Sequence, residues 1–158
     1  MFKSPDLNKA KRDVDALFSM VPTGDSAYFE LSSHWAQYLC VRVSGFMEEA
    51  YEIIFTEYVE NGASPKITKY AKRHISNGRK NPNTDKIRQM LCAFSLEWGN
   101  RFEEFAKREG RKDALDSVMN NRHLVAHGRR SEVTITQVKA YFDKCVEIME
   151  WVETLLAE

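Results

Sequence analysis

The fold is decided by residues 35–59, which read WAQYLCVRVSGFMEEAYEIIFTEYV. Apolar residues recur here at spacings of three and four, the period of a helix face. They form two stripes, and only a narrow strip around Gly45, Glu49, Glu52 and Thr56 is predicted to face solvent. One stripe holds Trp35, Leu39, Val43, Phe46, Ala50 and Ile53, and the other holds Cys40, Val41, Ser44, Met47, Tyr51, Phe55 and Tyr58. A helix that is apolar on two sides is mostly buried, so this segment is predicted to be the central helix, from about Ser26 or Ser33 to Val59.

Helical signals continue on both sides of this segment. A capping box of Thr134 and Gln137 starts an amphipathic C-terminal helix. Near the N-terminus, Val21-Pro22-Thr23-Gly24-Asp25 is predicted to end the first helix. The other predicted helices run from Pro5 to about Met20, Lys66 to about Ile75, Asn83 or Thr84 to about Phe94, Leu96 to about Arg108, and Arg111 to His127. The segment from Asn77 to Asn83 is predicted to be a loop. No stretch alternates as a strand would, so we expect one all-α bundle of five to seven helices spanning residues 1–158.

Composition places the chain among globular proteins. Of its 158 residues 43% are hydrophobic and 29% are charged, and the formal net charge is zero. Three cysteines, Cys40, Cys92 and Cys145, are odd in number and far apart, which favours reduced thiols in a cytoplasmic protein over a disulfide framework. No N-terminal apolar signal segment and no apolar run of membrane-spanning length is present, so we expect no membrane association.

The charge is unevenly distributed along the chain. Residues 66–88 contain eight basic residues against one acidic residue, Asp85, for a net charge of +7. Such a window can attract polyanions, and Lys72, Arg73, Arg79 and Lys80 are its candidate RNA-binding residues. The alternative is an ordinary solvated helix face followed by a loop.

The candidate site lies in residues 120–130, which read NNRHLVAHGRR. Gly128 follows a helical run, so the last helical turn is predicted to end near His127. Arginine makes bidentate hydrogen bonds to phosphate oxygens, and imidazole accepts and donates protons near neutral pH. Arg122 and His127 are therefore candidates for chemistry on phosphate. Five positions separate them, or about 140° on a helix, so they converge only if the helix ends there. The alternative is that Arg and His simply favour a helix C-terminus through the macrodipole.

Glu48 is the one carboxylate predicted at the edge of the second apolar stripe. An unpaired carboxylate there is unfavourable, so it needs a partner. It either orients Arg122 or His127 or makes an ordinary ion pair. Other chemistries have little support, because the chain has no Gly-rich phosphate loop ending in Lys-Ser/Thr and no His-Glu-x-x-His; we expect no metal and no cofactor.

Several segments in order resemble the RiboL-PSP-HEPN branch of the HEPN superfamily. The motif Arg122-His123-x-x-x-His127 is similar to its Arg-x(4–6)-His motif, and the likeness extends over Trp35 to Gly128. The other similar segments are Leu39 to Glu48, Asn81-Pro82-Asn83 with Lys86-Ile87, Glu97-Trp98-Gly99, and Ala114-Leu115-Asp116-Ser117 followed by Asn120-Asn121.

The resemblance implies a helical bundle and a metal-independent endoribonuclease that cleaves RNA by attack of the ribose 2′-OH. His127 would be the general acid or base and Arg122 would stabilise phosphoryl charge. His123 and Asn121 would position the phosphate or orient His127, with Arg129 and Arg130 as further RNA contacts. It also implies a homodimer that brings two motifs together, in a toxin–antitoxin or phage-defence setting with a partner protein. The alternative is a non-catalytic module that binds RNA or a protein.

Overall fold

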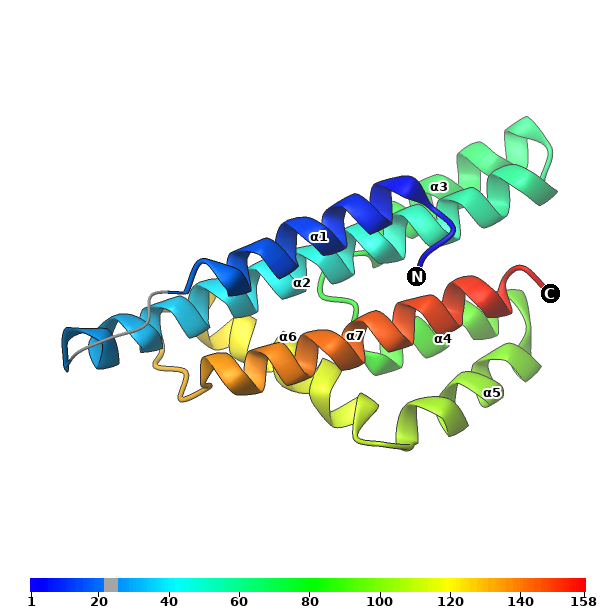
Figure 1. The fold of residues 1–158 in the computed structure, drawn as a ribbon. Helices are drawn as coiled ribbons and strands as arrows, with labels where there is room; N and C mark the ends of the chain where they lie inside the picture. The colour runs from blue at the N-terminus through cyan, green and yellow to red at the C-terminus, as the bar shows by residue number, and fades with distance from the viewer. Residues whose placement is uncertain (22–25) are drawn as a thin grey trace.

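The computed structural model describes residues 1–21 and 26–158, with side chains from residue 31 onward in the second range. The described residues form seven helices and no strand, so the predicted all-α bundle is confirmed (Figure 1). The helices are α1 (Pro5–Ser19), α2 (Ser26–Gly62), α3 (Pro65–Gly78), α4 (Thr84–Phe94), α5 (Leu96–Lys107), α6 (Arg111–Ala126) and α7 (Ile135–Leu155). The predicted break at 21–25 lies outside the described residues, apart from Val21.

The long helix α2 is the centre of the bundle and packs against α1, α3, α6 and α7. Leu39, Cys40, Val43 and Met47 are fully buried along it, as the two apolar stripes predicted. Val41 was assigned to the second stripe, and this was wrong: it is 39% exposed. It lines an open groove between α1 and α2, because α1 leaves this side of α2 partly uncovered.

Helix α7 supplies the opposite wall of the core. Its buried stripe includes Phe142, whose ring lies 5.4 Å from that of Phe46 on α2 and 5.9 Å from that of Phe18 on α1. The predicted capping box starts the helix: the Thr134 N–H donates to Gln137 Oε1 at 2.9 Å, and the Gln137 N–H donates to Thr134 Oγ1 at 3.2 Å. Helix α7 packs mainly against α6 and α2, and the Phe142 ring also reaches Phe18 of α1.

The boundaries of α4 and α5 follow their capping residues. Asn83 Oδ1 accepts the Lys86 N–H at 3.0 Å and Ser95 Oγ accepts the Trp98 N–H at 3.5 Å, so both predicted starts are confirmed. None of the described helices combines the length and apolar content that a bilayer crossing needs.

Helix α3 is longer than predicted, because it continues through Asn77 to Gly78. Ile75 is buried, and the backbone at Gly78 lies under the Tyr51 hydroxyl, where an added Cβ would be only 2.9 Å from the oxygen. Packing on α2 therefore overrides the turn preference of Asn-Gly. The connection to α4 begins at Arg79, and this shorter loop faces the predicted site.

Candidate functional site

The motif helix α6 ends at a tight turn. His127 is its C-cap, and Gly128 has a φ of +66°, the left-handed conformation that glycine adopts without strain. The Gly128 N–H donates to Val125 O at 3.1 Å and the Arg129 N–H donates to Leu124 O at 2.9 Å. These two bonds make a Schellman motif, so the helix ends where the sequence predicted. The turn leaves Arg129 and Arg130 exposed just beyond the helix.

Two imidazoles meet at this helix end. The ring centroids of His123 and His127 are 4.3 Å apart with the planes tilted by 60°, and both residues are exposed. They are one turn apart and therefore share a face. The structure brings His123, a secondary candidate, into direct contact with His127.

Arg122 is anchored by its backbone and leaves its guanidinium at the surface. The α6 backbone here lies on α2, where the Cys40 thiol donates to Val118 O at 3.5 Å. Burial raises the pKa of Cys40 to about 11, with a smaller opposite effect from the Arg122 backbone N–H. The Arg122 side chain turns toward Glu48, and its Nη2 lies 3.8 Å from Glu48 Oε1. This separation is too long for a hydrogen bond, so the guanidinium keeps its donors available.

Glu48 links Arg122 to the loop before α4. The backbone N–H of Asn81 donates to the same Glu48 Oε1 at 3.1 Å. Asn81 has a φ of +54°, and its side-chain Oδ1 is buried with no hydrogen-bond partner among the described residues. On the other side of the loop, the N–H and hydroxyl of Thr84 both donate to Asp116 Oδ1, at 3.1 and 2.9 Å. Carboxylates from α2 and α6 therefore hold this loop against the arginine.

No pattern in the sequence predicted a site role for Asn81. Asn81-Pro82-Asn83 appeared only as part of the family resemblance, and a turn composition does not indicate which amide meets which carboxylate. The signal that was present is the asparagine itself, because asparagine tolerates a positive φ better than most residues.

Asn121 ties α6 to the link that leads to α7. Its Nδ2 donates to Ser117 O at 2.8 Å, and its Oδ1 accepts the hydroxyl of buried Ser131 at 2.7 Å. Both polar ends of the amide are thus occupied within the chain, and the link is held beside the helix end.

An open groove of about 990 Å³ lies next to this turn. Its walls come from the first part of α2, the end of α6 and the 128–134 link, and they include His34, Gln37, Val125, Arg129 and Arg130. The charged residues of its lining are Arg129, Arg130 and Glu132, so basic side chains outnumber acidic ones.

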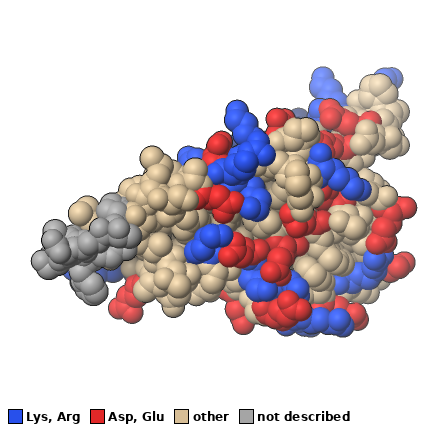
Figure 2. All heavy atoms as spheres, viewed as in Figure 1, with Lys and Arg blue, Asp and Glu red and all other residues tan. Residues whose placement is uncertain are grey.

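The four basic candidates of the 66–88 window divide into two kinds. Lys72 pairs with Glu60 and Arg79 pairs with Glu52, both carboxylates of α2. Arg73 and Lys80 are exposed and have no acidic partner in the described part of the chain. The two pairs partly neutralise the local basic excess of the sequence. Figure 2 shows basic and acidic side chains interspersed over the visible face of the protein.

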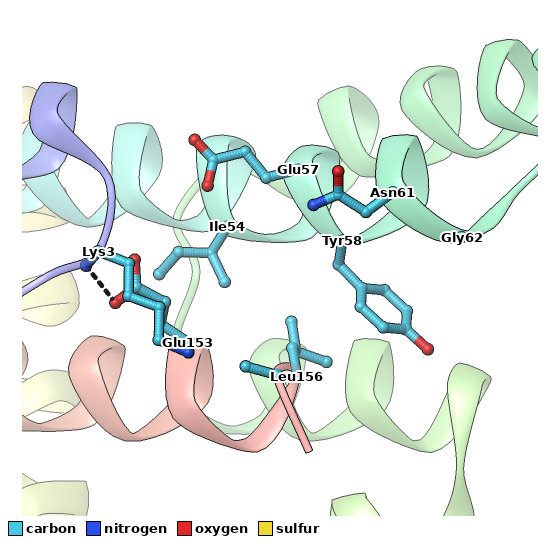
Figure 3. Close-up of a pocket in the computed structure, with 9 residues that line it drawn as sticks. Lys3, Ile54, Glu57, Tyr58, Asn61, Gly62, Glu153 and Leu156 are labelled. Carbon is cyan, nitrogen blue, oxygen red and sulfur yellow. Dashed lines mark hydrogen bonds between the residues drawn. The ribbon is translucent and has the colours of Figure 1, made fainter.

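A second hollow lies at the other end of α2, between the N-terminal segment and the end of α7 (Figure 3). It measures about 390 Å³ and is lined by residues that include Lys3, Tyr58, Asn61 and Glu153. The Lys3 backbone N–H donates to Glu153 Oε2 at 2.8 Å, so this carboxylate already ties two segments together. No histidine or cysteine lines this hollow.

In the described residues no three or more His, Cys, Asp or Glu side chains are grouped so that they could hold a metal ion.

These features define the class of protein: a helical bundle around one long helix, with an Arg-and-His turn at the end of a shorter one. A family model described as RiboL-PSP-HEPN matches residues 6–158, and the chain belongs to this family. No curated protein and no solved structure matches the chain.

Proposed function

We propose that this protein is a metal-independent endoribonuclease. The observation that carries the proposal is the end of α6, which presents the exposed imidazoles of His123 and His127 and, one residue before His123, the half-exposed side chain of Arg122. Membership of the RiboL-PSP-HEPN family supports RNA as the ligand.

In the proposed reaction the ribose 2′-OH attacks the adjacent phosphorus. A base takes the 2′-OH proton, the bond from phosphorus to the 5′-oxygen breaks, and an acid returns a proton to that oxygen. The products are a 2′,3′-cyclic phosphate and a 5′-OH. His127 acts as acid or base, a role worth about 10²–10⁴-fold, and Arg122 stabilises the charge on the phosphoryl oxygens. The requirement for a 2′-OH selects RNA over DNA.

His123 and Asn121 have supporting roles in this proposal. His123 contacts the ring of His127 and can hold its orientation. Asn121 holds the link that carries Arg129 and Arg130, through its bond to Ser131. Arg129 and Arg130 then contact RNA phosphates along the adjoining groove, with Arg73 and Lys80 as more distant contacts.

The active form in this proposal is a homodimer with a composite site. In one chain the Arg122 guanidinium lies beside Glu48. A second copy, related by a two-fold axis, would supply an arginine to the imidazoles of the first. Exposed apolar residues on α2, namely Leu31, Tyr38 and Val41, give a surface for such an interface, and Gly45 beside them has open space around it. A cytoplasmic toxin–antitoxin or phage-defence pair, with an antitoxin or defence partner, is the setting we propose.

A second candidate is a non-catalytic member that binds RNA or a protein. The observation that favours it is the Glu48 contact: Arg122 already has an acidic neighbour, and both ends of the Asn121 amide are engaged. In this case the turn would be a structural and binding element.

RNA cleavage with and without EDTA separates the two candidates. Cleavage that survives EDTA and leaves cyclic-phosphate ends, and that is lost in His127→Ala, supports the nuclease. Asn100→Ala, which removes an exposed polar side chain on α5, is the control and should cleave as the wild type does. Activity that requires a divalent ion contradicts the mechanism, and no cleavage of any RNA by the wild type favours the binding module.

The composite site has its own test. Mixing Arg122→Ala subunits with His127→Ala subunits should recover part of the activity, because some heterodimers then hold one intact copy of each residue. An active protein that sediments as a strict monomer contradicts the composite site.

A further inference from the structure

Helix α3 presents a solvent-facing side that the proposed cleavage site does not use. Residues advance by about 100° per position, so Lys66, Tyr70 and Arg73 share one side of the helix, with Lys69 at its edge. Buried Ile75 lies on the opposite side, against α2. The solvent-facing side of α3 is therefore not purely polar, because it carries the aromatic residue Tyr70 between charged residues.

The Tyr70 side chain is conspicuously free. It is 78% exposed, and its ring makes no aromatic contact among the described residues. Neighbouring Ile67 is 59% exposed as well. Tyrosine rings usually pack against other groups when a partner exists, so an isolated exposed ring on a rigid helix suits an external planar ligand.

The cations around Tyr70 are unpaired, in contrast to those on the flank of α3. Lys66, Lys69 and Arg73 are exposed, and none has a carboxylate partner in the described structure. Lys72, on the flank, is neutralised by Glu60. The Tyr70 ring therefore has three unpaired cations near it on the same helix: Lys66 one turn earlier, Lys69 directly before it and Arg73 three residues later.

We propose that the outer face of α3 is a docking platform for single-stranded RNA. A base stacks on Tyr70, and neighbouring phosphates contact Lys66, Lys69 and Arg73, the combination that single-stranded nucleic acid sites use. The proposal rests on the proposed function in taking RNA as the ligand. An acidic partner would match the cations alone, whereas RNA also accounts for the exposed ring.

The platform is remote from the cleavage turn. α3 contacts α2 through Lys72 and Glu60, whereas the α6 backbone at Arg122 lies on α2 at Cys40. These α2 positions are twenty residues apart, or about 30 Å along a helix. Figure 1 shows α3 and the link between α6 and α7 toward opposite ends of α2. The platform therefore holds RNA at a distance from the scissile bond and favours long substrates over short ones.

Binding of an uncleavable oligonucleotide tests the platform without relying on catalysis. The probe is a single-stranded oligoribonucleotide with 2′-O-methyl riboses, titrated into the full chain over a range of salt concentrations. Tyr70→Ala should weaken binding about 5- to 150-fold at every salt concentration, since stacking is worth about 1–3 kcal/mol per base. Tyr70→Phe keeps the ring and should bind within about twofold of the wild type, given that stacking needs only the π face.

Charge reversal gives the second readout. Lys66→Glu, Lys69→Glu and Arg73→Glu together should weaken binding and lower the salt slope by about 2, at about 0.7 per phosphate contact for single strands. The matched control carries Lys9→Glu, Arg12→Glu and Arg108→Glu, three exposed cations without acidic partners in the described chain, and should keep the wild-type slope.

Three results would overturn the platform: Tyr70→Ala binding as tightly as the wild type, Tyr70→Phe binding as weakly as Tyr70→Ala, or Tyr70-dependent binding to phosphatidylserine vesicles with no binding to the oligonucleotide. Its failure is distinguishable from failure of the nuclease. A protein that cleaves RNA with Tyr70-independent binding refutes only the platform. A protein with Tyr70-dependent binding and no cleavage refutes only the nuclease.

Discussion

Two arginines near opposite ends of α6 have contrasting surroundings. Arg111 is buried, and its Nε donates to Glu147 Oε2 at 3.0 Å while its Nη2 donates to Glu109 Oε2 at 2.7 Å. Its guanidinium also lies 4.2 Å above the ring centroid of Phe105. Arg122 has a 39% exposed side chain and one acidic neighbour at 3.8 Å.

The difference separates arginines that hold the fold from arginines that are available to a ligand. The donors of Arg111 are used within the chain, so removing it leaves carboxylates and carbonyls without their partner. The donors of Arg122 are largely unused, so the folded state depends little on it. Exposure and donor occupancy therefore indicate a role that residue type alone does not.

The largest expected effects come from removing each arginine in turn. Arg122→Ala should lower RNA cleavage about 10²–10³-fold, as loss of one transition-state donor does, with a melting temperature close to that of the wild type. Arg111→Ala should instead destabilise the fold by about 2–3 kcal/mol, because it breaks a buried pair whose carboxylates are partly exposed. Cleavage per folded molecule in Arg111→Ala should remain close to the wild-type rate.

Denaturant unfolding and initial cleavage rates measure the two effects separately. The contrast fails if Arg122→Ala unfolds the protein as much as Arg111→Ala does. It also fails if Arg111→Ala loses cleavage under conditions where the protein is fully folded.

The acidic neighbour of Arg122 gives the next test. Glu48→Gln removes the charge facing Arg122 but keeps an oxygen that can accept the Asn81 N–H. We expect kcat to fall by up to about tenfold, because the guanidinium is no longer oriented, whereas stability should change by less than about 1 kcal/mol for so exposed a pair.

Glu52→Gln is the matched control, since Glu52 is one turn further along α2 and pairs with Arg79. It should leave kcat unchanged. Equal effects of the two substitutions on kcat would show that Glu48 acts through general charge and not through Arg122.

The turn that carries the imidazoles gives a smaller effect. Gly128 has a φ of +66°, so Gly128→Ala should destabilise the protein by about 1 kcal/mol through backbone strain. Gly62→Ala is the control, because Gly62 is in a helix with open space around it and should be neutral or slightly stabilising. Thermal unfolding of both variants checks the prediction, and a neutral Gly128→Ala would contradict the tight turn.

The smallest effect concerns the pH dependence of the buried arginine pair. Partial burial by itself would raise the pKa of Glu147, but hydrogen bonds and charge from Lys144 and Arg111 outweigh it and hold the pKa below its usual range. A lowered pKa in the folded state means that the pair stabilises the protein above the unfolded pKa of glutamate. That contribution is lost as pH falls through the folded value. Glu147→Gln should therefore lose less stability than the wild type on acidification, as urea titrations from neutral pH to below pH 4 would measure.

Sequence alone determined the helices and most of the core. Asn83, Ser95 and the Thr134–Gln137 box are local signals, since each cap is made within three residues, and they gave correct helix starts. The turn at Gly128 was equally local. Periodicity predicted the buried faces of α2 and α7, because the helix period fixes which residues share a side.

Only the tertiary structure decided which charges meet. From the sequence, Glu48 could face either Arg122 or His127, and the packing of α6 on α2 put it beside Arg122. The same packing let Glu48 accept the Asn81 N–H from a loop that no sequence signal connected to it. The exposure of Val41 also depends on tertiary packing, since it is set by how much of α2 is covered by α1.

The basic window of residues 66–88 shows most clearly what the sequence could not predict. Lys72 and Arg79 were candidates on equal terms with Arg73 and Lys80, but the first two meet Glu60 and Glu52 of α2 while the other two remain free. Composition fixes how many charges a segment carries. Which of these charges stay available to a ligand depends on contacts between residues far apart in sequence, and such contacts form only when the chain folds.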